Sequence, residues 1–234
     1  MSAKEISLTL KALADSEIAK HSQRFFKTGK GEYGEGDKFL GIRVPVLRQH
    51  AKRFESASLN EIQNILKSPY HEERLCALLM LVRKFKKGDA KEQKAIYTLY
   101  MKGIQYINNW DLVDSSAHQI VGSFLETRSR RPIYKLAKSK NLWERRIAIM
   151  STFHWIKNNN FDEALVISRL LLDDSEDLIH KAVGWMLREI GNRNLSMEKS
   201  FLKQHYKRMP RTMLRYAIEK FPEEERIKYL SGNA

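Results

Sequence analysis

Apolar residues recur at three- and four-residue spacing along nearly the whole chain, and this pattern constrains the fold more than any other feature. Such a period places the apolar side chains on one face of an α-helix. Strand-like alternation is almost absent, and only 11 glycines and 5 prolines interrupt the 234 residues. The sequence therefore predicts an all-α protein of about a dozen helices joined by short loops, with no long linker within residues 1–234.

Local signals indicate where some helices begin and end. Ser58 followed by Glu61 has the pattern of a capping box, in which each residue satisfies a backbone N–H of the other. Pro210 is typical of the end of a helix, because proline cannot continue one. The segment from Thr28 to Asp37 is rich in glycine and charge, so we expect it to form a loop.

Small or short apolar residues recur at intervals of about 33 to 37 residues, which is near the period of paired-helix solenoids. The set is Ala77, Val113, Ala148, Ala182 or Gly184, and Ala217. Each unit would be a helical hairpin that buries its apolar face by stacking on the next hairpin. The prediction is one curved domain over residues 1–234 with a concave side. An irregular helical bundle, in which small residues recur by chance, is the alternative.

The charge balance favours an acidic partner. The 42 Lys and Arg against 28 Asp and Glu give a formal net charge of +14, and nucleic acid is the natural candidate. The single cysteine, Cys76, lies in the apolar run Leu75 to Val82 and is expected to be a packed thiol. That run is too short to cross a bilayer, and the N-terminus has no signal-peptide core. We therefore expect a soluble, cytoplasmic protein.

The segment NNWDLVD (108–114) places Trp110 and Asp114 four residues apart. This spacing stacks the two side chains on one face of a helix. An aromatic plate beside a carboxylate, in a basic protein, suggests a surface that meets a polyanion and acts on it chemically. An ordinary amphipathic helix with a core tryptophan and a solvated aspartate is the other interpretation.

Five blocks of the sequence resemble the AlkD-type DNA alkylation repair glycosylases. They are FLGIRVPVLR (39–48), NNWDLVD (108–114), LWERRIAIM (142–150), KAVGWMLREIG (181–191) and MPRTMLRYAIEKF (209–221), and they are spread over most of the chain in the family's order. The resemblance implies a monomer built from HEAT-like repeats that binds duplex DNA in a concave basic face. It also implies hydrolysis of the N-glycosidic bond of cationic alkylated purines, such as 3-methyladenine and 7-methylguanine, without a metal or organic cofactor.

The resemblance further implies roles for single residues. The family's catalytic carboxylate matches Asp114, its paired aromatics match Trp110 and Trp185, and its catalytic-site arginine matches Arg146. The further candidates for contacts with DNA phosphates are Arg43, Arg48, Lys181, Arg188, Arg211 and Arg215. The chain departs from some members at residues 43–45 (Arg-Val-Pro), where a hydroxyl used near a phosphate is absent.

The chemistry expected at this site follows from the charge of the substrate. A cationic purine departs as a neutral base, so the enzyme has to stabilise an oxocarbenium-like sugar and direct a water molecule. An ionised Asp114 can do both, while Trp110 and Trp185 would present electron-rich faces to a cation. Arg146 is expected to be a surface arginine that holds a backbone phosphate.

Several alternatives stay open. Asp114 and His118 are also four residues apart and could form an acid–base pair, although a histidine on an apolar helix more often satisfies a local hydrogen bond. The chain has no HExxH motif and no cysteine pair, so we expect no metal site. A noncatalytic protein that binds duplex or branched DNA is the first rival function. A solenoid that binds acidic peptides is the second.

Overall fold

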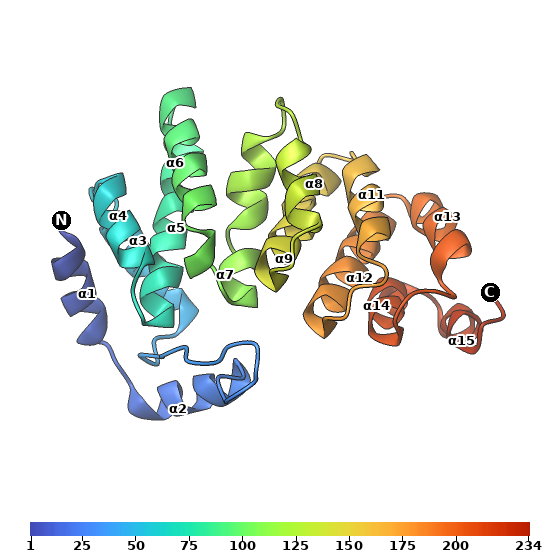
Figure 1. Cartoon of the computed structure of the whole chain (residues 1–234), viewed down its shortest axis with the longest axis horizontal. Helices are drawn as coiled ribbons and strands as arrows, with labels where there is room; N and C mark the ends of the chain where they lie inside the picture. The colour runs from blue at the N-terminus through green and yellow to red at the C-terminus, as the bar shows by residue number, and fades with distance from the viewer. The chain divides into compact units, whose positions relative to one another are not determined.

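The computed structural model describes all 234 residues as two compact units, an N-terminal unit of Met1–Ser116 and a C-terminal unit of Ala117–Ala234 (Figure 1). Both units are helical, and the one β-type contact is an isolated bridge between Lys38 and Tyr70. The prediction of an all-α protein is confirmed. None of the helices combines the length and apolar character that crossing a membrane requires.

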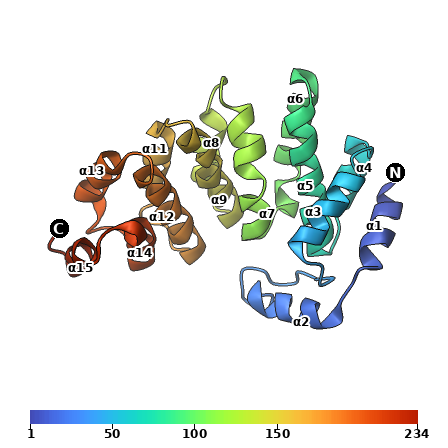
Figure 2. The same ribbon diagram turned by 180° about the vertical axis from the view of Figure 1, so that it is seen from behind.

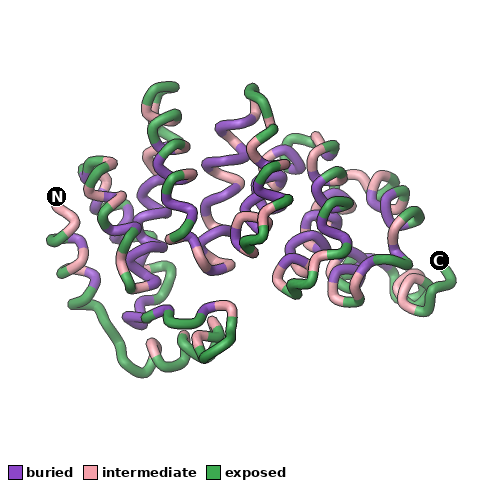
Figure 3. Tube along the Cα trace, in the orientation of Figure 1, coloured by how far each residue is buried: buried purple, intermediate pink, exposed green.

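The N-terminal unit is built around α5 (His71–Lys87), which packs against α3, α4, α6 and α7. The other elements of the unit are α1 (Ala3–Lys11), α2 (Ser16–Phe25), α3 (Val44–Arg53), α4 (Leu59–Leu66), α6 (Ala90–Lys102), the 3-10 turn η1 (Ile104–Tyr106) and α7 (Trp110–Asp114). Most of α5 is buried (Figure 3), including the predicted apolar run Leu75 to Val82. Burial, aided by the charge of Glu73, raises the pKa of the Cys76 thiol, as expected for a packed cysteine.

The helix α2 buries none of its residues, and the chain that follows it runs without a helix to α3 (Figure 2). This agrees with the predicted loop. The buried carboxylate of Glu72 fastens the end of the loop to α5 by accepting hydrogen bonds from the N–H groups of Leu40 (2.8 Å) and Gly41 (2.7 Å). Gly41 has a φ of +83°, and a Cβ there would lie 2.0 Å from the carbonyl oxygen of Asp15, so only glycine fits.

The C-terminal unit is built around α9 (Leu142–Ser151) and α12 (Asp177–Gly191), which pack against each other. Its other elements are the π-helical turn η2 (His118–Gly122), α8 (Arg131–Ala137), α10 (Phe153–Lys157), α11 (Asp162–Leu170), α13 (Leu195–His205), α14 (Arg211–Ala217), the 3-10 turn η3 (Ile218–Lys220) and α15 (Glu223–Ser231). The helix α12 also packs against α13 and α14. Gly184 allows the last of these contacts, because a Cβ there would lie 2.4 Å from the carbonyl oxygen of Met213.

The repeating small residues lie in α5, α7, α9, α12 and α14, and every one of them is buried. Their burial is what the period predicts for stacked helical pairs. The contacts of α5 with α7, of α9 with α12 and of α12 with α14 follow this order within the two units.

Two local predictions need correction. Ser58 does cap α4 by accepting from the N–H of Glu61 (3.3 Å), but the Glu61 carboxylate accepts from the N–H of Ala3 instead of returning to Ser58. The reciprocal half of the capping box is absent because α1 supplies a better-placed donor. Pro210 precedes α14 as its N-terminal cap residue, and its φ of −52° suits that position.

Candidate active site

Trp110 and Asp114 are the first and last residues of α7, so the predicted helical spacing is confirmed. Both side chains are partly exposed. The N-terminal cap residue of the helix is Asn109, a fully buried residue whose side-chain oxygen accepts from the N–H of Trp110 (2.9 Å). With five residues, α7 makes little more than one turn, and a helix this short depends on contacts with the rest of the protein.

Aromatic rings support the indole of Trp110. It stacks on the ring of Phe26, with the centroids 5.2 Å apart and the planes at 20°, and Phe26 in turn stacks on Phe39 at 5.0 Å. Phe25, the last residue of α2, meets the indole edge-on at 5.9 Å and is itself 59% exposed. One face of Trp110 is therefore covered by Phe26, and the indole lies at the surface instead of in the core.

A buried histidine joins α7 to the loop that precedes α3. Nδ1 of His71 lies 2.8 Å from Oδ2 of Asp37, and Nε2 of His71 lies 2.8 Å from Oδ2 of Asp111. Asp37 also accepts a hydrogen bond from Arg74 (2.7 Å), and Arg74 reaches Asn108 (3.2 Å). The residues just before and within the first turn of α7 are thus held by polar side chains from α5.

The charges in this network balance. Burial opposes a charge on His71, but the attraction of Asp111 and the hydrogen bonds to both carboxylates prevail and raise the pKa of the imidazole to about 9. Burial likewise works against ionised Asp37, yet the hydrogen bond from His71 and the charge of Arg74 hold its pKa below the ordinary value. The two cations, His71 and Arg74, are therefore matched by the two carboxylates of Asp37 and Asp111. No group of three or more His, Cys, Asp and Glu side chains here or elsewhere is arranged to hold a metal ion.

Asp114 lies near a second buried group, the phenol of Tyr100. Burial raises the pKa of Tyr100, a hydrogen bond with Ser116 (3.0 Å) opposes that rise, and the negative charge of Asp114 adds to it. The hydroxyl of Ser116 also donates to the carbonyl of Leu112 within α7. The end of the helix that carries Asp114 is therefore tied to the packed part of the N-terminal unit.

In the C-terminal unit, Trp185 is partly exposed on α12. Its Nε1–H donates to Oε1 of Glu189 (3.2 Å), and its ring lies 6.0 Å from that of Phe153. Arg193 donates to the other oxygen of Glu189 (2.8 Å) and so fixes the carboxylate that holds the indole. The two predicted tryptophans are both surface aromatics with a defined orientation.

His118 does not continue the helix of Asp114. The helix α7 ends at Asp114, a turn follows, and His118 begins η2, where its ring lies 5.3 Å from Phe153. Asp114 and His118 therefore do not belong to one continuous α-helix. Gly122 allows η2 to pack closely on α9, because a Cβ at this position would lie 2.3 Å from the carbonyl oxygen of Ser151. Single π-helical turns are frequent at functional sites.

Arg146 is buried, with 4% of its surface exposed, which corrects the expectation of a surface arginine. Its guanidinium donates to the carbonyl oxygen of Leu178, in the first turn of α12. The sequence could not indicate this burial, because the partner lies 32 residues away. Arg146 therefore links α9 to the helix that carries Trp185.

The six candidate phosphate ligands divide by their partners. Lys181 pairs with Asp177 (2.8 Å), Arg188 pairs with Glu219, and Arg211 donates to the carbonyl oxygen of Leu230. The exposed residues whose side chains make no intramolecular hydrogen bond or ion pair are Arg43, the N-terminal cap residue of α3, Arg48 on α3 and Arg215 on α14. These three arginines present the most accessible positive charge of the set.

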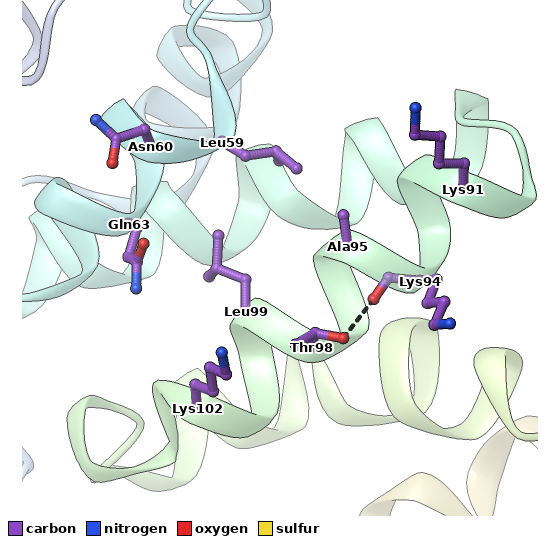
Figure 4. A pocket seen from close by; sticks show the side chains of 9 residues that line it. All are labelled: Leu59, Asn60, Gln63, Lys91, Lys94, Ala95, Thr98, Leu99 and Lys102. Carbon is purple, nitrogen blue, oxygen red and sulfur yellow. Dashed lines mark hydrogen bonds between the residues drawn. The ribbon is translucent and has the colours of Figure 1, made fainter.

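A separate groove of about 510 Å³ lies between α4 and α6 (Figure 4). Its apolar part comes from Leu59, Ala95 and Leu99, and the polar residues that line it are Asn60, Gln63, Lys91, Lys94, Thr98 and Lys102. No carboxylate, imidazole or aromatic ring lines the groove, so it offers no group for acid–base catalysis or for stacking on a base. The candidate chemistry remains with α7 and α12.

Asp37 and His71, which support α7, are not among the site residues that the sequence predicts. Asp37 falls in the segment predicted only as a loop, and His71 was one of seven scattered histidines. No local pattern could identify the bridge, because His71 lies 34 residues from Asp37 and 40 from Asp111. A usable signal was Asn109, since an asparagine directly before a helix is typical of an N-terminal cap.

Comparisons with known proteins identify the family and the fold of the chain. The model of the DNA alkylation repair enzyme family matches residues 6–221. No curated protein matches the chain. Among solved structures, the chain is similar to a predicted DNA alkylation repair enzyme from Enterococcus faecalis, with a TM-score of 0.69, 18% identity, and coverage of 90% of this chain and 97% of that chain.

Two structures from Streptococcus mutans are also similar. AlkD2 has a TM-score of 0.56 and 21% identity over 78% of this chain and 91% of its own. The protein smu.31, from strain UA159, has a TM-score of 0.53 and 18% identity over 94% of this chain and 99% of its own. At these identities the likeness to the solved structures shows the fold.

Proposed function

Because this chain belongs to the DNA alkylation repair enzyme family, we propose that it is a DNA glycosylase. Its substrates are cationic alkylated purines in duplex DNA, such as 3-methyladenine and 7-methylguanine, and it hydrolyses their N-glycosidic bond as a monomer without a cofactor. The observation that best supports this proposal is the placement of an aromatic plate and a carboxylate at the two ends of α7, both partly exposed.

Asp114 supplies the electrostatic part of the mechanism. The C1′–N bond of a cationic purine breaks with both bonding electrons passing to the base, which leaves neutral, while positive charge develops on the sugar. A fixed carboxylate stabilises that charge and orients a water molecule, whose oxygen bonds to C1′ while its proton passes to the carboxylate. The hydrogen bonds around Ser116 and Asn109 keep the helix that carries this carboxylate in one place.

Each of the two tryptophans offers an indole face to a cationic group of the substrate. An indole face attracts a cation by about 0.5 to 2 kcal/mol, more where water is excluded. Trp110 is held by Phe26, and Trp185 is oriented by its hydrogen bond to Glu189, so neither indole has to be ordered when the substrate arrives. Arg146 supports this function through α12, whose first turn it holds at Leu178.

Arginines at the start of α3, within α3 and on α14 bind the DNA backbone. Arg43, Arg48 and Arg215 are exposed and have no competing carboxylate, so their guanidinium groups can meet phosphate oxygens at little cost. Lys181, Arg188 and Arg211 have intramolecular partners and would bind phosphate by exchanging them.

The test is release of free base from methylated duplex DNA under single-turnover conditions, with the products separated by chromatography. We expect 3-methyladenine and 7-methylguanine to be released, and the Asp114→Asn variant to bind the duplex without releasing them. Binding of duplex or branched DNA by the wild-type protein with no release of either base would favour the noncatalytic alternative. Absence of DNA binding at low salt would favour a peptide-binding solenoid.

A further inference from the structure

The imidazole of His71 contacts two carboxylates from different segments of the N-terminal unit. Asp37 belongs to the loop before α3, and Asp111 belongs to the first turn of α7. His71 itself begins α5, the central helix of the unit, and is 1% exposed. Its backbone N–H donates to the carbonyl oxygen of Lys38 (2.8 Å), so the loop is held by its main chain as well.

The geometry requires both ring nitrogens of His71 to carry protons. Each nitrogen lies 2.8 Å from a carboxylate oxygen, and an ionised carboxylate only accepts hydrogen bonds. A neutral imidazole has a single N–H, so one of the two carboxylate oxygens would face an unprotonated ring nitrogen. Only the imidazolium satisfies both, and the raised pKa of His71 agrees with this.

The residues on both sides of Trp110 are held by hydrogen bonds. Asn108, Asn109 and Asp111 are engaged by Arg74, by the backbone of α7 itself and by His71, respectively. Trp110 lies among them and is placed by its stacking on Phe26. The ring of His71 also lies 4.9 Å from that of Phe26, on which the indole of Trp110 stacks. His71 therefore supports Trp110 through Phe26 as well as through Asp111.

We propose that Asp37, His71 and Asp111 form a clamp that positions α7, and with it Trp110 and Asp114, for base excision. The three are positioning residues that touch no substrate, and the inference rests on the proposed function. Without the clamp, α7 would still carry Trp110 and Asp114, but the indole and the carboxylate would no longer be held in fixed directions. A displacement of about 1 Å in a reacting group can lower a rate on the order of 100-fold.

The test compares His71→Gln with Glu73→Gln. Glu73 is a matched control because it lies on the same helix, is similarly buried, and bonds Ser7 of α1 (2.6 Å) instead of α7. Both proteins would be labelled with 5-fluorotryptophan, which gives one ¹⁹F resonance for each of the four tryptophans. The signal lost in Trp110→Phe identifies Trp110. Duplex affinity and single-turnover release of 7-methylguanine would be measured on the same samples.

We expect His71→Gln to shift or broaden the Trp110 resonance and to slow excision by about 10-fold to 100-fold, with duplex affinity changed less than about twofold. Glu73→Gln should leave both readouts near the wild-type values. Should His71→Gln fail to fold, Asp111→Asn removes one side of the clamp and has the same expected outcome. An unchanged Trp110 resonance together with a wild-type excision rate would overturn the clamp. If the wild-type protein releases no base, the proposed function fails, and the ¹⁹F comparison still decides whether the clamp positions Trp110.

Discussion

The guanidinium of Arg146, on α9, donates a hydrogen bond to the backbone carbonyl of Leu178, in the first turn of α12. The carbonyl groups of a first helical turn already accept hydrogen bonds along the helix, so the arginine acts as an added link between two packed helices. Arg146 is buried. The helix α12 carries Trp185 two turns after Leu178. A residue matched to the family's catalytic site is therefore also part of the packing of the C-terminal unit.

This position predicts that Arg146→Ala lowers stability as well as activity. Loss of a buried hydrogen bond from a charged donor, together with the space left by the side chain, should reduce the free energy of unfolding by about 1 to 3 kcal/mol. Urea unfolding followed by circular dichroism would measure the change. The exposed Arg215→Ala serves as the comparison, for which we expect a change within about 0.5 kcal/mol. Equal stabilities of the two variants would contradict the bridging role of Arg146.

Replacing Asp114 with Asn should abolish chemistry while DNA binding persists. The side chain keeps its size but loses the charge that opposes the developing positive sugar, and such a loss lowers the rate on the order of 10²–10³-fold. Removal of a negative charge from a surface that meets phosphates should leave duplex affinity equal or slightly higher. Excision by this variant at the wild-type rate would rule out Asp114 as the catalytic carboxylate.

Binding to duplex DNA should weaken steeply as salt rises. Each phosphate neutralised by a Lys or Arg contributes about −0.9 to the slope of log K against log salt concentration. Arg215→Ala should reduce the magnitude of that slope by about 1, whereas Lys86→Ala, which removes an exposed cation outside the proposed set, should leave it unchanged. Fluorescence anisotropy at several salt concentrations would measure both slopes. Identical effects would indicate that net charge, not a particular surface, binds the DNA.

Replacing His118 with Gln should slow excision only modestly. A cationic purine leaves as a neutral base, so the reaction needs no general acid, and His118 begins a π-helical turn beside Phe153. Single-turnover release of 7-methylguanine at pH 7 would measure the effect. A loss of about 10²-fold or more in a folded protein is the usual size of a general acid–base contribution and would assign that role to His118.

Glu198 should make the protein less stable as pH rises. It lies 2% exposed on α13, and one of its carboxyl oxygens has no hydrogen-bond partner. Burial raises its pKa to about 8, against the opposing charges of Arg188 and Lys199. The folded protein therefore holds a proton that the unfolded chain releases near pH 4.5. That contribution to stability is complete below pH 4.5 and is lost as pH rises through about 8.

Glu198→Gln keeps the neutral form at every pH, so it should be more stable than the wild type at pH 8 to 9, by a margin on the order of a few kcal/mol. The exposed Glu224→Gln is the control and should have no such effect. His71 contributes with the same sign between its ordinary pKa and about 9, so the variants are compared with the wild type at each pH. Equal thermal stability of Glu198→Gln and wild type at pH 9 would show that Glu198 ionises in the folded protein without penalty.

The sequence by itself determined the class of the fold and the local geometry of the site. The period of apolar residues fixed which faces are buried, because side chains three and four residues apart share a helical face. The small residues near every 35th position, including Ala77 and Ala148, mark where helices pack. The spacing of Trp110 and Asp114 likewise predicted their common helix, since both lie within one turn of chain.

Only the tertiary structure decided which charged side chains are buried and which groups they meet. Arg146 reads as a surface arginine in its local sequence, but a helix that starts more than 30 residues later covers it. His71 has no local partner, and both of its carboxylates come from distant segments. Burial and long-range hydrogen bonds depend on how elements pack, whereas helical periodicity depends on neighbouring residues alone. For this reason the sequence located the proposed catalytic residues, and the packing revealed what holds them in place.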